Sequence, residues 1–137
     1  MSNTKPIGVA YEDQNIIGAD FLYADGEIGY TASAQGTVTQ LTDKSTAVTL
    51  NRSAGQITMN NAALGAATNV AFTLNNSLLS AKDVVVVNVA GGVASTGTYN
   101  CWVSGHSAGS CAIVLRNISG GSLSEAVVIN FAIIHCT

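Results

Sequence analysis

The sequence predicts an all-β fold, an antiparallel β-sandwich or jelly-roll-like barrel of about eight strands, with an extended N-terminal arm. From residue 36 onward, short apolar and β-branched segments recur between turn residues at intervals of roughly 8–12 positions, as in sandwiches and barrels. Before residue 36, acidic and isolated apolar residues follow neither a strand period nor a helix period. We therefore expect an attachment arm over residues 1–35 and one β-sandwich domain over residues 36–137.

The arm combines negative charge with scattered apolar residues. Five of the eight acidic residues lie in it, namely Glu12, Asp13, Asp20, Asp25 and Glu27. Its apolar anchors are Pro6, Tyr11, Ile16, Ile17, Phe21, Leu22 and Tyr23. Isolated anchors cannot form a core alone, so we expect these seven residues to contact a partner or a neighbouring subunit. The acids lack the spacing of a calcium-binding loop, which favours solvation or pairing with basic groups of a partner.

The first four predicted strands follow the arm and alternate apolar with polar residues. They cover residues 36–41, 46–50, 56–59 and 69–75. In the last of them, Val70, Phe72 and Leu74 fall on one face. Period-two alternation indicates that one face of each strand is buried and that the other faces solvent or a partner.

The later strands are of two kinds. Residues 83–89 and 126–134 are nearly continuous β-branched or apolar runs, which predicts strands covered on both faces. The second run has no charge or proline to protect an edge, so we expect it to be a central strand. Residues 98–104 and 110–117 flank a glycine-rich connection and predict a hairpin. Residues 61–64 and 77–80 could each form one helical turn.

The composition favours a protein that assembles. Charged residues make up 9% of the chain, whereas roughly a quarter is usual. A solvated monomer normally covers its surface with charge, so we expect much of this surface to be buried in a homo-oligomer, with a trimer as the expected form. Scattered basic residues argue against nucleic-acid binding, and no apolar run approaches the ~18 residues of a membrane span. The first residues contain no apolar signal segment, and the three cysteines are expected to be reduced thiols of a protein made in the cytoplasm. A bond between Cys101 and Cys111 is the less favoured alternative.

One segment matches a hydrolase motif. Residues 105–109 read G-x-S-x-G, and Ser107, Glu125 and His135 follow one another in the order of an α/β-hydrolase triad. That motif requires a strand, a sharp turn and a helix, whereas the residues after Ser107 read as a strand. We therefore interpret the segment as a hairpin loop and expect no catalytic residues and no enzyme activity.

Two further groups of residues give weaker indications of a functional site. Cysteine and histidine gather towards the C-terminus without the paired spacing of zinc sites, so we expect no metal and no other cofactor. These residues are Cys101, His106, Cys111, His135 and Cys136. Tyr99 and Trp102 could form a stacking platform, although a lone aromatic pair is more often part of a core or an interface.

Several segments resemble small structural proteins of tailed-phage virions. The resemblance lies in residues 5–14, 36–40, 55–60, 83–88, 108–111 and 115–126. These are β-sandwich proteins, often capsid decoration (cement) proteins, with related domains in head or tail fibres. The resemblance implies that the chain binds the major capsid protein through its arm, stabilises the assembled head shell and resides on the capsid surface of the virion. The alternative that it implies is a fibre or spike domain that binds a host surface glycan.

Overall fold

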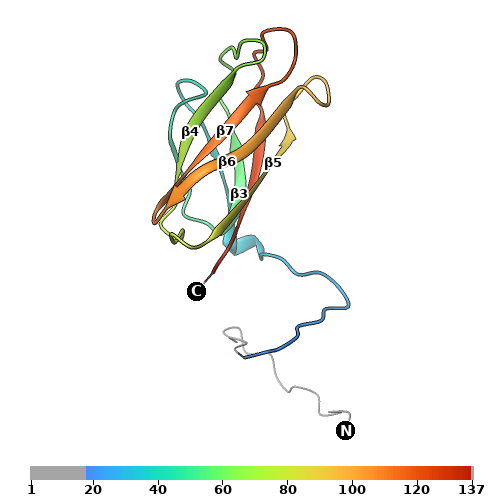
Figure 1. The fold of residues 1–137 in the computed structure, drawn as a ribbon, viewed down its shortest axis with the longest axis vertical. Helices are drawn as coiled ribbons and strands as arrows, with labels where there is room; N and C mark the ends of the chain where they lie inside the picture. Colours follow the sequence, from blue (N-terminus) through green and yellow to red (C-terminus); the bar gives the residue numbers. More distant parts are fainter. Residues whose placement is uncertain (1–17, 137) are drawn as a thin grey trace.

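The computed structural model describes residues 18–136 and confirms the predicted fold class. Two four-stranded sheets pack face to face as a sandwich, and the arm leads away from one end of it (Figure 1). The last described residues lie at that same end. Six residues with predicted arm roles, Pro6, Tyr11, Glu12, Asp13, Ile16 and Ile17, lie outside the described residues.

Each predicted strand is present. The elements are a 3-10 turn η1 (Ala32–Ala34) and the strands β1 (Gln35–Thr39), β2 (Val48–Thr49), β3 (Ala54–Thr58), β4 (Asn69–Asn75), β5 (Val84–Gly91), β6 (Tyr99–Ser107), β7 (Ser110–Asn117) and β8 (Val128–Ile134). The expected helical turns did not form. Leu64 instead forms a β-bridge with Leu123, and Ser77 and Leu78 lie in a short hydrogen-bonded turn.

The strands form sheet A in the order β1-β3-β8-β5 and sheet B in the order β2-β4-β7-β6. Strand β8 is central, as predicted, but only its inner face is fully covered within the described chain, since its outward residues are partly exposed and Ile134 is 56% exposed. The β6–β7 hairpin turns through Ala108 and Gly109, and Gly109 takes the left-handed φ of 84° that glycine adopts without strain. Two pairs, β1–β3 and β2–β4, are parallel, whereas the sequence had suggested antiparallel pairing throughout. The chain alternates between the sheets from β1 to β4, and such crossovers return a strand in the same direction.

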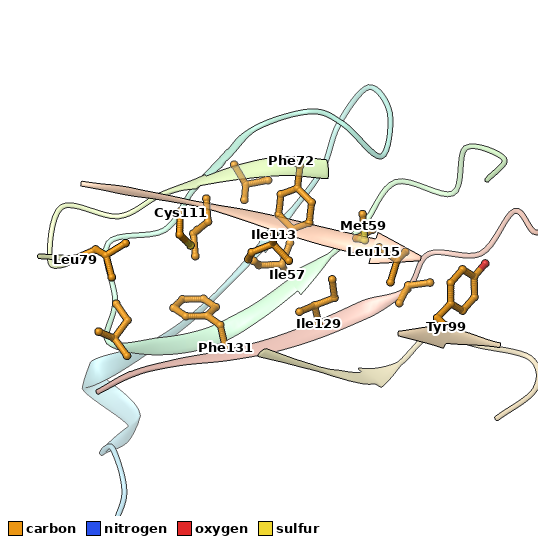
Figure 2. Packing of buried hydrophobic residues seen from close by; sticks show 14 of the residues in the cluster. Ile57, Met59, Phe72, Leu79, Tyr99, Cys111, Ile113, Leu115, Ile129 and Phe131 are labelled. Carbon is orange, nitrogen blue, oxygen red and sulfur yellow. The ribbon is translucent and has the colours of Figure 1, made fainter. Parts of the chain in front are cut away.

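The core lies between the two sheets and follows the predicted alternation (Figure 2). In β4 the inward residues Phe72 and Leu74 are buried, and in β8 Ile129, Phe131 and Ile133 are buried. Burial of a side chain of this size contributes about 1.5–3 kcal/mol. The alternation in the sequence therefore identified the core faces.

Strand β5 differs from the prediction that both of its faces are covered. It lies at the edge of sheet A, and its burial alternates along its whole length. Val85 and Val87 pack against the core, but Val84 and Val86 are each 50% exposed. A run of valines places apolar side chains on both faces of a strand, whether or not both faces are covered. The sequence alone therefore could not identify the open face.

Candidate assembly surface

The outer surface of sheet A carries no charge. We call it the sheet A face. Its outward-pointing residues, assigned from burial and register, are Gln35, Thr37, Thr39, Ala54, Gln56, Thr58, Val84, Val86, Asn88, Val128, Asn130, Ala132 and Ile134. Depletion of charge distinguishes the centre of protein interfaces from ordinary surface. The sheet A face therefore has the composition of a contact surface.

A hollow of about 630 Å³ lies in the sheet A face next to the base of the arm. Small residues on neighbouring strands, among them Ala54 and Ala132, line it, and Tyr30 borders it from the arm side. Short side chains at paired positions leave the sheet backbone close to the surface, which accounts for the hollow. Ala54 pairs with Ala132 directly across β3 and β8.

A row of polar side chains crosses the same hollow. Thr37, Gln56, Asn130 and Asn88 are register partners across all four strands of sheet A. The side-chain oxygen of Asn130 is buried and has no hydrogen-bond partner among the described residues. A buried acceptor without a partner costs about 1–3 kcal/mol. The exposed polar groups of the row are those of Thr37, Gln56 and Asn88.

The described arm exposes its apolar residues. Phe21, Leu22 and Tyr23 are 75%, 64% and 85% exposed, and the rings of Phe21 and Tyr23 stack with their centroids 6.0 Å apart. Ile28 is 76% exposed. Phe21, Leu22 and Tyr23, the predicted anchors among the described residues, thus have no covering surface within the described part of their own chain.

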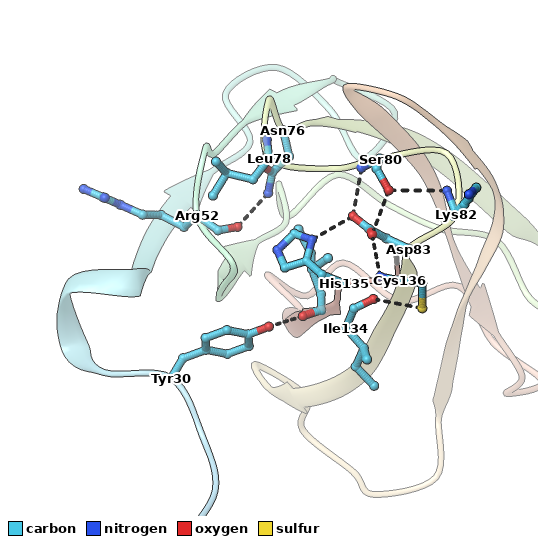
Figure 3. Close-up of polar contacts among 11 residues, drawn as sticks. Tyr30, Arg52, Asn76, Leu78, Ser80, Lys82, Asp83, Ile134, His135 and Cys136 are labelled. Atoms are coloured by element: carbon cyan, nitrogen blue, oxygen red, sulfur yellow. Dashed lines mark hydrogen bonds and ion pairs between the residues drawn. The ribbon is translucent and has the colours of Figure 1, made fainter. Parts of the chain in front are cut away.

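The arm joins the sandwich at Tyr30. Its hydroxyl donates to the backbone carbonyl of Ile133 at the end of β8 (Figure 3). The side-chain amide of Gln35 donates to the carbonyl of Tyr30 at 2.9 Å. These bonds fix the base of the arm beside the hollow.

A buried carboxylate holds the chain terminus at this end. Asp83 accepts hydrogen bonds from the backbone N–H and the hydroxyl of Ser80, each at 2.8 Å, and from the N–H of Cys136 at 3.1 Å. It also pairs with Nδ1 of His135 at 3.0 Å. The Ser80 N–H, with smaller contributions from the other donors, holds the pKa of Asp83 well below its usual value although desolvation opposes this. The arrangement ties the residues after β8 to the loop before β5.

The residues of the hydrolase-like motif have separate partners. Ser107 lies 3.4 Å from the hydroxyl of Ser110, with β7 following the turn where the motif would need a helix. Glu125 accepts a bond from the N–H of Ala94 at 2.6 Å, and His135 pairs with Asp83. Glu125 precedes β8 and His135 follows it, so the length of a strand, roughly 25 Å, separates them. The structure does not bring this triad together.

The cysteines and aromatic residues are also dispersed. All three cysteines are free, and the register places Cys101 opposite Leu115, which keeps it away from Cys111. Burial raises the pKa of Cys111 to about 11 and favours its thiol form. Tyr99 is buried in the core, whereas Trp102 lies on the outer side of sheet B, so they form no joint platform. Among residues 18–136, no group of three or more potential metal ligands gathers.

Sequence reasoning missed a buried lysine. Lys44 is 3% exposed, and its ammonium donates to the backbone carbonyls of Asn60 and Glu125, both at 2.5 Å. Burial lowers the pKa of Lys44, while the charge of Glu125 opposes that shift. Burial together with Glu125 also raises the pKa of Tyr99 to about 12. Lys44 braces two loops, and nothing in its polar sequence context distinguished it from a surface lysine.

No family model, curated protein or solved structure matches this chain. In the described part of the chain, no helix has the length and apolar character needed to cross a membrane.

Proposed function

We propose that this chain is a decoration protein of a tailed-phage head, which binds the assembled capsid shell and stabilises it. The observation that carries the proposal is an arm with exposed apolar anchors on a sandwich whose sheet A face is free of charge. Both features suit a protein that buries much of its surface on binding. In this proposal the arm contacts the major capsid protein or a neighbouring copy, and the sandwich forms the outer knob of a homo-oligomer, expected to be a trimer.

The mechanism of stabilisation is selective binding, in which the chain binds the assembled shell and not its separated parts. A ligand that binds the assembled state and not its separated parts stabilises that state by RT ln(1 + [L]/Kd), about 2.7 kcal/mol at a hundredfold excess over Kd. An oligomer that engages several sites increases the effect, because its later contacts form at high effective concentration. The proposed role needs no chemical step and no cofactor.

The test adds the purified full chain to phage heads that lack it and measures the temperature at which the heads release DNA. We expect the wild-type chain to raise that temperature. A variant in which Phe21, Leu22 and Tyr23 are all serine should bind weakly, whereas Leu41→Ser, which changes an 86% exposed residue of the sandwich, should act as wild type. Equal binding by both variants would contradict the role of the arm, and no binding by any chain would contradict the proposed function.

A fibre or spike domain that binds a host glycan is the second candidate. The polar row and Tyr30 favour it, because amides and an aromatic ring beside an uncharged hollow are groups that can contact a sugar. A glycan array probed with the full chain tests this function. A specific signal that Gln56→Ala abolishes, without a change in shell binding, would favour it over decoration.

A further inference from the structure

The geometry points to an exchange of arms between copies. We propose that the hollow of the sheet A face receives residues 18–29 of the arm of a second copy of this chain. The inference deepens the proposed function and rests on it, because it specifies how the arm would contact a neighbouring copy. It concerns two copies in solution and requires no capsid shell.

The hollow offers unused hydrogen-bonding groups to an extended peptide. Thr37, Gln56 and Asn88 line the hollow and expose their polar side chains to it. An extended segment presents backbone N–H and C=O groups along its length, and these groups need partners once water is excluded. The polar row can supply such partners, while the small residues beside it leave space for the backbone and its side chains.

The arm carries the apolar groups that this space can cover. The stacked rings of Phe21 and Tyr23 form a compact block, and both rings are largely exposed in their own chain. An apolar strip of Val84, Val86 and Ile134 lies half exposed along the β5 side of the sheet A face. Contact between the block and this strip would bury apolar area on both partners at about 25 cal/mol per Å².

The charges are complementary. Residues 18–29 contain Asp20, Asp25 and Glu27 and no basic residue, so two arms would repel each other. The sheet A face is itself uncharged, and Arg52 and Lys82 are exposed at the end of the domain where the arm begins (Figure 3). Neither cation has an ion-pair partner within residues 18–136. An arm that crosses the hollow of a neighbour can place its acids near these cations.

The direction of the arm favours a neighbour over the same chain. Tyr30 fixes the arm at the end of β8, and from there the chain runs away from the sandwich (Figure 1). Twelve extended residues span up to roughly 40 Å, longer than a strand of this sandwich, so they reach an adjacent domain. To enter its own hollow, the arm would have to reverse immediately before Tyr30.

Disulfide trapping between two full-length chains of different tag length tests the exchange. Both chains carry Cys101→Ala and Cys136→Ser, which leaves only the buried Cys111. One chain carries Leu22→Cys in the arm, and the other carries Gln56→Cys in the hollow. Under mild oxidation we expect the mixed dimer to form at least tenfold faster than with a partner that carries Ala71→Cys, an exposed position on the outer side of sheet B. Equal trapping at Gln56→Cys and Ala71→Cys, or none, would overturn the proposal.

A second measurement needs no cysteine changes. Sedimentation of the otherwise native full chain near 100 µM should show association, which Val86→Glu abolishes and Ala71→Glu preserves. A monomeric wild type, or equal effects of the two glutamates, would overturn the exchange. Since no capsid is present in either experiment, these outcomes are separate from the test of shell binding.

Discussion

Buried amide side chains act in this protein as braces for its loops. Asn117 donates to the carbonyls of Leu64, Gly65 and Gly121 at 3.0, 3.0 and 2.8 Å, and its own oxygen accepts from the N–H of Ser119. Asn76 binds the carbonyl of Arg52 in a similar way. Each of these buried amides is satisfied by backbone groups of the loops, which explains why the core tolerates buried polar residues.

At the residue scale, Phe131 is the most informative core position to test. It is 3% exposed on the central strand β8. Phe131→Ala should lower the free energy of unfolding by about 3–5 kcal/mol, because it removes buried area and leaves a cavity. Urea denaturation followed by circular dichroism measures the loss. The control Leu41→Ala should change stability by less than about 0.5 kcal/mol, and a Phe131→Ala variant as stable as this control would contradict the packing.

Asp83 should make the free energy of unfolding depend on pH in the acidic range. Its pKa is lower in the folded chain than the usual value near 3.9, so its contribution is fully present above that value and declines as the pH falls further towards the folded pKa. Asp83→Asn should therefore destabilise the chain most at neutral pH, and the difference from wild type should shrink below about pH 4. Thermal melts of both chains from pH 7 to pH 2 measure this difference. A difference that does not vary with pH would show that Asp83 acts through its shape alone.

At the element scale, the sequence predicted the position of every strand and the β6–β7 hairpin, but not the other pairings. Alternation identifies a strand and its inward face, and β4 and β7 begin and end as predicted. The parallel pairs could not be predicted, because alternation is the same in both directions. The open face of β5 was missed because valines occupy both of its sides. The braces had a local signal, since Asn76 and Asn117 each bond the N–H two residues later, a turn typical of asparagine.

The candidate surface was predictable only in part. Low charge predicted burial in assembly contacts. The described anchors Phe21, Leu22 and Tyr23 are exposed, and their contact with a partner stays a prediction. The hollow and the polar row were not predictable, because they depend on the register of four strands. Tyr30 was not among the predicted anchors, although it is the residue that binds the arm to β8.

Removal of the arm should leave the sandwich folded. Residues 18–29 lie outside the core, and Tyr30 and η1 remain when residues 1–29 are deleted. The truncated chain should retain the β-type circular dichroism spectrum and a cooperative melt at low protein concentration. A spectrum of an unfolded chain would show that the arm is required for folding of the sandwich.

At the scale of the whole molecule, the proposed contact between the arm and the sheet A face of a second copy predicts that stability depends on association. Association that occurs only between folded chains stabilises them by mass action, which adds up to about 1.4 kcal/mol for each tenfold rise in free partner. For a domain of this size, that corresponds to a rise of several degrees in the melting temperature. The full chain should therefore melt at higher temperature as its concentration increases from about 1 to 100 µM, whereas the chain that lacks residues 1–29 should melt at a nearly constant temperature. Scanning calorimetry of both chains across this range is the measurement, with Val86→Glu as a full-length control expected to behave as the truncated chain does. If all three chains showed the same dependence on concentration, the association would involve a surface other than the arm and the sheet A face.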